Sequence, residues 1–198
     1  MTRIYLIRHG HVDHPTNIFY GPATPLSTQG QAQIAKLAED FIATDIKPDA
    51  MICSPYQRTR DTLDILHDYF PDAPASQDKR LEEWRVGDWE GQPLADFFAY
   101  THYDQQPAAL LPHDIEPLED CAARVQTVIR EILTSHHNKT IFLVSHREPL
   151  ACAISKYQNS PWEKIHELPI PVASAWESVF DAMLPQKLEP RFDRSSLE

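Results

Sequence analysis

Three short apolar runs, each followed directly by polar residues, constrain the fold of this chain more than any other feature. The runs occupy residues 4–7 (Ile-Tyr-Leu-Ile), 141–144 (Ile-Phe-Leu-Val) and, more weakly, 50–53 (Ala-Met-Ile-Cys). A segment that is apolar at every position is typical of a strand buried on both faces, as in a parallel sheet covered by helices. The runs therefore predict strands of such a sheet.

Stretches with helical spacing of apolar residues lie between and after these runs. The spacing predicts helices at about 28–42, from near Tyr56 to Phe70, at about 125–133, and from Pro149 to Tyr157. Thr28 and Gln31 are expected to form a capping box, and Pro149 to open the last helix, since a first-turn proline loses no needed N–H. Strands that alternate with helices predict an α/β fold, a three-layer α/β/α sandwich with a largely parallel central sheet.

The length of 198 residues predicts a single domain, 1–198, with one continuous core. The stretch 89–117 differs from the rest, because it carries aromatic residues followed by three prolines, and it is interpreted as an insertion or lid. The tail after Val179 is short and punctuated by prolines.

The net charge of −11 argues against nucleic-acid and acidic-membrane partners, whose binding draws on clustered Lys and Arg. The amino-terminal residues form neither a secretory signal nor a membrane span, so a cytoplasmic location is expected. Cys53, Cys121 and Cys152 are odd in number and widely spaced, which favours buried reduced thiols over a disulfide framework or zinc site. Nothing in the sequence indicates the oligomeric state.

The ends of the predicted strands carry an unusual set of basic side chains for so acidic a chain. The first strand leads to Arg8 and His9, the second to Ser54 with Arg58 just beyond, and the third to His146. In open α/β sheets, ligands bind in the crevice at the carboxyl ends of the strands. Two histidines and two arginines are therefore expected to meet at one edge, as an anion-binding site.

Five motifs in chain order resemble those of the histidine phosphatase (phosphoglycerate mutase-like) superfamily. They span residues 3 to about 155, and each is weak alone, whereas the ordered set is specific. The motifs are Arg8-His9-Gly10, Pro25-Leu26-Ser27-x-x-Gly30-x-x-Gln33, Ser54-Pro55-x-x-Arg58-Thr59-x-x-Thr62, Leu81-x-Glu83-x-x-x-Gly87-Asp88-Trp89-Glu90-Gly91 and Val144-Ser145-His146. The resemblance implies a phosphoglycerate mutase-like fold, and the Gly87 to Gly91 segment and the short chain look more like the small phosphatases, including alpha-ribazole phosphatase-like proteins.

The resemblance also implies roles for individual residues. His9 is expected to be the nucleophile that forms a phosphohistidine, and Glu83, desolvated by Trp84 or Trp89, the general acid. Arg8, Arg58 and His146 are expected to bind the phosphoryl oxygens, for which the arginine fork is well suited.

Two further candidates depart from the family pattern. Asn17 is a weaker candidate for phosphate binding, because the segment after the nucleophile does not align cleanly. Arg147 follows His146 where many relatives carry glycine, and it either contacts the anion or faces solvent.

The stretch from His9 to His14 permits a second interpretation. His9, His11, Asp13 and His14 match the H-x-H-x-D-H spacing of two-metal hydrolases. Such a site needs further histidines and a bridging carboxylate at later strand ends, where this chain instead has arginines that would repel metal ions. The site is therefore expected to hold no metal, and no cofactor is expected.

The sequence thus favours a metal-independent phosphatase that hydrolyses phosphomonoesters of small metabolites. A phosphoglycerate mutase-type phosphotransferase, a two-metal hydrolase and a phosphate-binding protein without turnover are the alternatives. The presence of Glu83 argues against a mere binding protein, which needs no general acid.

Overall fold

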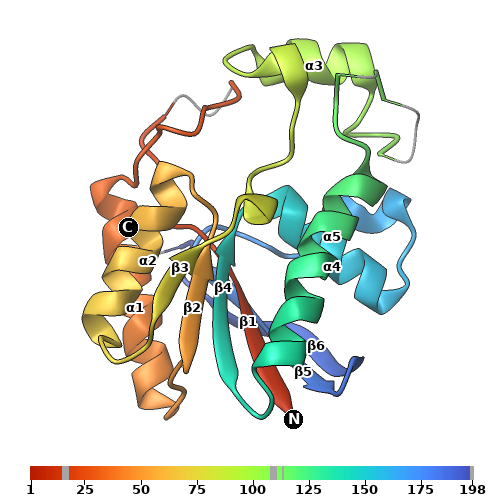
Figure 1. The fold of residues 1–198 in the computed structure, drawn as a ribbon. Helices are drawn as coiled ribbons and strands as arrows, with labels where there is room; N and C mark the ends of the chain where they lie inside the picture. Colours follow the sequence, from red (N-terminus) through yellow and green to blue (C-terminus); the bar gives the residue numbers. More distant parts are fainter. Residues whose placement is uncertain (15–17, 108–110, 113, 197–198) are drawn as a thin grey trace.

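The computed structural model describes residues 1–14, 18–107, 111–112 and 114–196, and it places a six-stranded sheet at the centre (Figure 1). The strand order is β3-β2-β4-β1-β5-β6, with parallel pairing from β3 to β1 and antiparallel pairing of β5 and β6 at one side. The strands are β1 (Thr2–Arg8), β2 (Ala50–Cys53), β3 (Ala75–Gln77), β4 (Thr140–Ser145), β5 (Ser174–Asp181) and β6 (Leu184–Asp193). The mostly parallel sheet confirms the predicted fold class.

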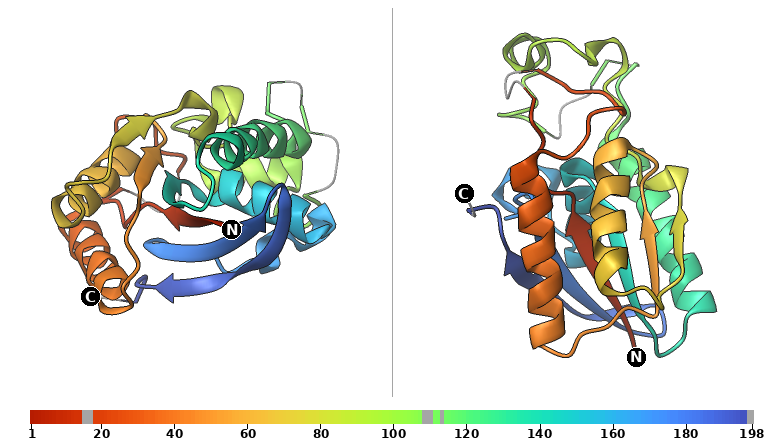
Figure 2. Two further views of the ribbon diagram at one scale, coloured as in Figure 1. Left: turned by 60° about the horizontal axis from the view of Figure 1, so that its bottom comes forward. Right: turned by 90° about the vertical axis from the view of Figure 1, so that its left-hand side faces the viewer.

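Helices cover both faces of the sheet. Helices α1 (Thr28–Ala43) and α2 (Gln57–Tyr69) lie on one face, and α4 (Leu118–Ser135) and α5 (Arg147–Gln158) lie on the other (Figures 1 and 2). The remaining helices are α3 (Leu94–Thr101) and the 3₁₀ helices η1 (Lys79–Leu81), η2 (Gly87–Trp89) and η3 (Trp162–Glu167).

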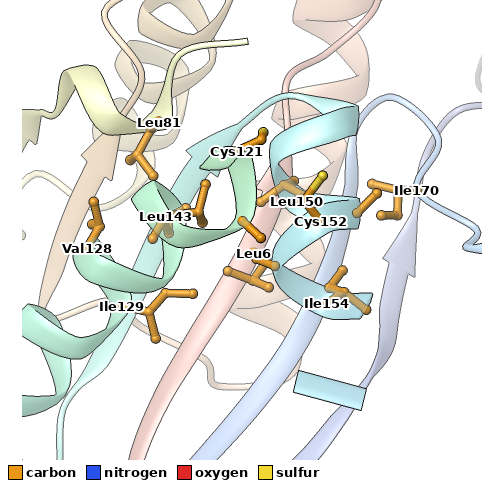
Figure 3. Close-up of a cluster of buried hydrophobic side chains, with 14 of the residues drawn as sticks. Leu6, Leu81, Cys121, Val128, Ile129, Leu143, Leu150, Cys152, Ile154 and Ile170 are labelled. Atoms are coloured by element: carbon orange, nitrogen blue, oxygen red, sulfur yellow. The ribbon is translucent and has the colours of Figure 1, made fainter. Parts of the chain in front are cut away.

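Alternate side chains of the central strands enter two separate cores. In β1, Ile4 and Leu6 pack with the α4 and α5 side, whereas Tyr5 and Ile7 pack with the α1 and α2 side. Figure 3 shows the first of these cores, in which Leu6 and Leu143 lie against residues of α4 and α5. This period of two between opposite faces explains why the strands are apolar at every position.

The predicted strands and helices are confirmed, with two errors at helix starts. Ser27, rather than Thr28, caps α1, and its hydroxyl accepts a hydrogen bond from Gly30 N. Helix α5 begins at Arg147, with His146 as its N-cap residue, so Pro149 lies within the first turn rather than opening the helix. A first-turn proline is tolerated there because its missing N–H has no partner within the helix.

The proline-punctuated tail after Val179 contains the end of β5 and all of β6. These two strands form an antiparallel hairpin, which pairs with β1 through β5. Strand β6 is an edge strand, and register shifts in its pairing with β5 accompany Pro185 and Pro190. Proline lacks the N–H needed for hydrogen bonds within a central strand, but it is tolerated at an edge strand or a bulge. Prolines in a sequence therefore argue against a strand, although β6 accommodates two of them.

Helix α3 stands above the carboxyl ends of the parallel strands (Figure 1). It belongs to the stretch 89–117, of which residues 108–110 and 113 lie outside the described part. No helix in the described ranges combines the length and apolar character that crossing a bilayer requires.

Candidate active site

The carboxyl ends of three neighbouring parallel strands converge below α3. Strands β1 and β4 pair in register up to Arg8 and Ser145, and β2 pairs with β4 up to Cys53. The backbone N–H of His9 donates to Ser145 O at 3.2 Å, just past the end of that pairing. The residues that follow each strand are thereby held beside one another.

His9 is fully buried, and both of its ring nitrogens have defined partners. Nδ1 lies 2.8 Å from Gly10 O, and Nε2 lies 3.2 Å from Nε of Arg58. A carbonyl only accepts and a guanidinium only donates, so the neutral ring carries its proton on Nδ1, and its unprotonated Nε2 accepts a hydrogen bond from Nε of Arg58. Burial, and then the charges of Arg58 and Arg8, hold the pKa of His9 well below its usual value, so the ring is neutral at pH 7.

Glycine at position 10 permits a close approach of two backbone segments. A Cβ atom on Gly10 would lie 2.6 Å from Gly30 O in α1, and one on Gly30 would lie 2.1 Å from His11 O. Any side chain at either position would push the start of α1 away from the segment that follows β1. The two glycines therefore let α1 pack directly behind the carbonyl that orients His9.

Arg58, in the first turn of α2, is only 1% exposed. Besides the contact with His9, its Nη1 donates to Gly21 O at 3.1 Å, and its Nη2 lies 3.8 Å from Oε2 of Glu83. Its guanidinium also stacks near the rings of Tyr20 and Tyr56, at 4.8 and 5.1 Å from their centroids. Its charge is thereby held at a fixed position over His9.

Arg8 ends β1 and adds a second guanidinium to the site. Its Nη1 donates to Ile170 O at 2.7 Å, whereas its buried Nε has no hydrogen-bond partner among the described residues. A buried donor without a partner carries a free-energy cost, which an anionic ligand would offset.

His146 caps α5 and is fully buried beside His9, with ring centroids 5.3 Å apart. Its Nε2 lies 2.8 Å from Oγ of Ser54, and its Nδ1 lies 3.7 Å from Oε2 of Glu83 without a hydrogen bond in the described ranges. Burial, followed by the charge of Arg58, lowers the pKa of His146 well below its usual value.

Glu83 lies just after η1, and its side chain is 26% exposed. Burial, and then the nearby carboxylate of Glu148, raise the pKa of Glu83 to about 7, although Arg58 opposes this shift. A carboxyl group with this pKa can both donate and accept a proton near neutral pH. Glu82, by contrast, pairs with Arg85 at 3.5 Å.

Arg8, Arg58 and Glu83 line a cavity of about 230 Å³, and His9 and His146 lie fully buried beside these residues. Arg147 also lines the cavity, and its Nη1 donates to Oε1 of Glu148 at 2.7 Å. Trp84 lines the cavity next to Glu83, whereas Trp89 packs on Phe97 and Tyr100 without lining it. The residues that line the cavity are Arg8, Ile18, Phe19, Tyr20, Arg58, Glu83, Trp84, Val86, Leu94, Phe97, Phe98, Tyr103, Arg147 and Glu148.

Of the H-x-H-x-D-H stretch, His9 alone belongs to the group of potential metal ligands found among the described residues. Nδ1 of His11 lies 2.8 Å from Oγ of Ser27, at the start of α1, Asp13 is exposed, and the ring of His14 lies against Tyr20. Asn17, the weaker phosphate-binding candidate, lies outside the described residues.

One group of potential metal ligands is found in the described ranges, formed by His9, Glu83 and His146, whose ligand atoms lie within 4.8 Å of one another. The guanidinium of Arg58 contacts both His9 and Glu83. The fixed positive charge of this guanidinium would repel a metal ion and attract an anion, so the group is better suited to an anion.

Sequence reasoning did not find several residues that shape the site. Tyr20 stacks on Arg58, and Glu148 raises the pKa of Glu83, yet neither carries a signal in the sequence. Ile18 and Leu94 also line the cavity without a signal in the sequence.

Comparison with known proteins agrees with this geometry. The family model of the histidine phosphatase superfamily (branch 1) matches residues 4–187. A Mycobacterium tuberculosis protein, Rv0525, is 31% identical over 161 residues, which make up 75% of this chain and 75% of that protein.

Solved structures share the fold along the whole chain. The structure of Bacillus stearothermophilus YhfR matches with a TM-score of 0.89 at 22% identity, covering 99% of this chain and 100% of that one. The alpha-ribazole phosphatase from Shigella flexneri matches with a TM-score of 0.81 at 22% identity, covering 98% and 97%. The chain therefore belongs to the histidine phosphatase superfamily (branch 1), and it is a phosphatase.

Proposed function

We propose that this protein hydrolyses phosphomonoesters of small metabolites, without a metal ion, through a phosphohistidine on Nε2 of His9. The observation that carries the proposal is the fixed state of the His9 ring. Gly10 O accepts from the Nδ1 proton, and the unprotonated Nε2 accepts from Nε of Arg58, a hydrogen bond that a phosphoryl oxygen would take over on binding. A neutral imidazole with one unprotonated nitrogen among arginines is the arrangement that nucleophilic attack on a phosphoryl group requires.

In the first step, Nε2 of His9 forms a bond to phosphorus while the bond from phosphorus to the ester oxygen breaks. Glu83 donates its proton to that oxygen, and the alcohol leaves. In the second step, the Glu83 carboxylate accepts a proton from water as the water oxygen attacks phosphorus. The P–N bond then breaks, and inorganic phosphate leaves with His9 and Glu83 restored.

Arg8, Arg58 and His146 are the groups we assign to the phosphoryl oxygens. The buried position of Arg58 and His146 and the buried Nε of Arg8 support this role, because charges and donors fixed in a desolvated site stabilise developing negative charge without reorganising. Arg147 lies farther along the same cavity, and we assign to it a contact with the substrate. A role for Asn17 stays a prediction.

We also propose that residues 1–198 form one histidine phosphatase domain, with 89–117 as its lid. The family match over 4–187 and the position of α3 above the strand ends support this assignment. The net charge of −11 supports small-molecule rather than nucleic-acid partners, and three free, buried cysteines support a cytoplasmic location.

The experiment that tests the mechanism is hydrolysis of p-nitrophenyl phosphate in excess EDTA, followed by an alkaline quench and mass spectrometry. We expect turnover to persist with EDTA, and phosphate to be found on His9. His9→Asn, which keeps the approximate shape of the ring, is expected to abolish turnover and labelling.

His11→Asn is the matched control, because His11 bonds to Ser27 away from the cavity. We expect it to retain turnover, whereas a two-metal hydrolase would lose it. A folded His9→Asn variant with the wild-type rate, or EDTA inactivation reversed by added metal, would contradict the proposal. With metabolite esters, phosphate release well below alcohol release would indicate phosphotransfer instead.

A further inference from the structure

The cavity divides into a charged floor and an apolar wall. The charged residues of the floor are Arg8 at the end of β1, Arg58 at the start of α2 and Glu83 just after η1. The apolar residues come from the segment after β1, the segment after η1, and the region around α3. They are Ile18, Phe19, Trp84, Val86, Leu94, Phe97, Phe98 and Tyr103.

The aromatic part of this wall is packed ring against ring. The ring centroid of Phe97 lies 4.9 Å from that of Phe19, 5.8 Å from that of Trp84 and 5.6 Å from that of Phe98. Trp84 and Tyr103 stack at 4.5 Å. Phe97, Trp84 and Tyr103 are at most 5% exposed, so they form a fixed backing for the half-buried Phe19, Leu94 and Phe98.

Backbone contacts tie the two sides of the wall together. Ile18 forms a β-bridge with Pro93, Phe19 N donates to Gln92 O at 3.1 Å, and Gly91 N donates to Phe19 O at 2.9 Å. The segment after β1 thereby holds the stretch that leads into α3. These backbone contacts and the ring contacts above fix the wall from within the chain, so a substrate would not have to assemble it.

A phosphoryl group bound by Arg8 and Arg58 directs its ester oxygen toward Glu83, and the rest of the alcohol then faces this wall. In this wall Nε1 of Trp84 already donates to Glu116 O, and the hydroxyl of Tyr103 is buried without a partner in the described ranges, so it could satisfy a single substrate group. An alcohol with many hydroxyl groups would bury most of them against apolar side chains, whereas a flat apolar alcohol would pack against the rings. The cavity of about 230 Å³ lies below the roughly 300–1,000 Å³ of sites for drug-sized ligands, which limits the alcohol to a small one.

We propose that the preferred substrates are phosphate monoesters of small alcohols with an aromatic or branched apolar body, rather than sugar phosphates or phosphorylated acids. This inference rests on the proposed function, since it assumes that the phosphoryl group binds on the charged floor. Arg147 and Glu148, paired at 2.7 Å, provide the polar part of the wall beside the apolar residues.

The test compares kcat/KM for 2-phenylethyl phosphate and glycerol 1-phosphate. Both release a primary alkyl alcohol, so the acidity of the leaving group contributes little to the difference. We expect the kcat/KM for 2-phenylethyl phosphate to be at least about tenfold higher. The free energy gained by burying one aromatic ring against others corresponds to a difference of that size or larger. Phe98→Ser and Leu94→Ser are each expected to lower that preference several-fold, mainly through the KM for 2-phenylethyl phosphate.

Tyr100→Ser is the matched control, because Tyr100 lies on the same helix, is 63% exposed and does not line this cavity. It should leave the preference unchanged. Hydrolysis of both esters without a preference, or with a preference for glycerol 1-phosphate, would overturn the substrate class and leave the proposed function intact. Failure to hydrolyse either ester or p-nitrophenyl phosphate would overturn both proposals.

Discussion

Glu83 sets the pH range of the proposed reaction, because its carboxyl group must be protonated when the ester bond breaks. Its pKa of about 7 means that this proton is present below pH 7 and is lost as the pH rises through 7. His9 has a pKa well below its usual value, so it remains neutral over the same range. The value of kcat/KM for an alkyl phosphate should therefore fall above about pH 7.

Replacing Glu148 tests this account, since its charge is one cause of the raised pKa of Glu83. In Glu148→Gln that repulsion is removed, and Arg147 loses its partner and adds attraction for the ionised form. Both changes lower the pKa of Glu83, so the fall in kcat/KM should move to lower pH. The measurement is the pH profile of kcat/KM for one alkyl phosphate.

The control for this substitution is Glu163→Gln, which removes an exposed carboxylate that does not line the cavity. Its pH profile should match that of the wild type. A Glu148→Gln profile that is unchanged, or that moves to higher pH, would contradict the proposed electrostatic coupling.

At the scale of elements, one side chain of α4 anchors the segment that carries Glu83. Nη1 of Arg124 donates to the carbonyl oxygens of Arg80 and Glu82 at 2.8 and 2.7 Å, and Nη2 donates to Glu83 O at 3.1 Å. Arg124 also pairs with Glu116 at 2.6 Å, and both side chains are at most 10% exposed. Arg124 is therefore a positioning residue for the general acid.

Arg124→Gln should lower kcat/KM for 2-phenylethyl phosphate by roughly tenfold, part of the ~10²- to 10⁴-fold that a general acid supplies. The loss for p-nitrophenyl phosphate should be smaller, because its phenolate leaves without a proton. Steady-state kinetics with both esters measure the difference, and circular dichroism verifies that the variant is folded.

Arg130→Gln provides the matched control on the same helix, because Arg130 is exposed and its guanidinium bonds only Thr127 among the hydrogen bonds found in the described ranges. It should leave both rates near those of the wild type. Equal losses with both esters in Arg124→Gln would show that Arg124 acts on stability alone.

At the scale of the whole molecule, the reactivity of the three cysteine thiols tests whether solvent and reagents are excluded from the hydrophobic cores. Cys53, Cys121 and Cys152 are free and 0% exposed, and burial raises the pKa of Cys53 to about 12. A thiol must be accessible and ionised to react. Ellman's reagent should therefore find no reactive thiol in the folded protein and three after unfolding in guanidinium, and rapid reaction in native buffer would contradict this packing.

The elements that sequence could predict are those whose periodicity is local. Strands β1, β2 and β4 contain the runs 4–7, 50–53 and 141–144, which are apolar at every position, and helices α1, α2, α4 and α5 carry regular apolar stripes. Strand β6 has two prolines and an exposed face, so its pairing with β5 depends on a partner rather than on its own residues. Strand β3 is three exposed residues long, which leaves no pattern to detect.

The sequence by itself determined that Arg8, His9, Arg58 and His146 follow buried strands, and parallel pairing then brings these positions to one edge. Only the tertiary structure decided the proton position on His9 and the raised pKa of Glu83. Those properties depend on groups distant in the chain, namely Arg58 and Glu148, and on burial by both layers of helices. The apolar wall was likewise decided in three dimensions, because its residues come from separate segments whose contacts no local pattern encodes.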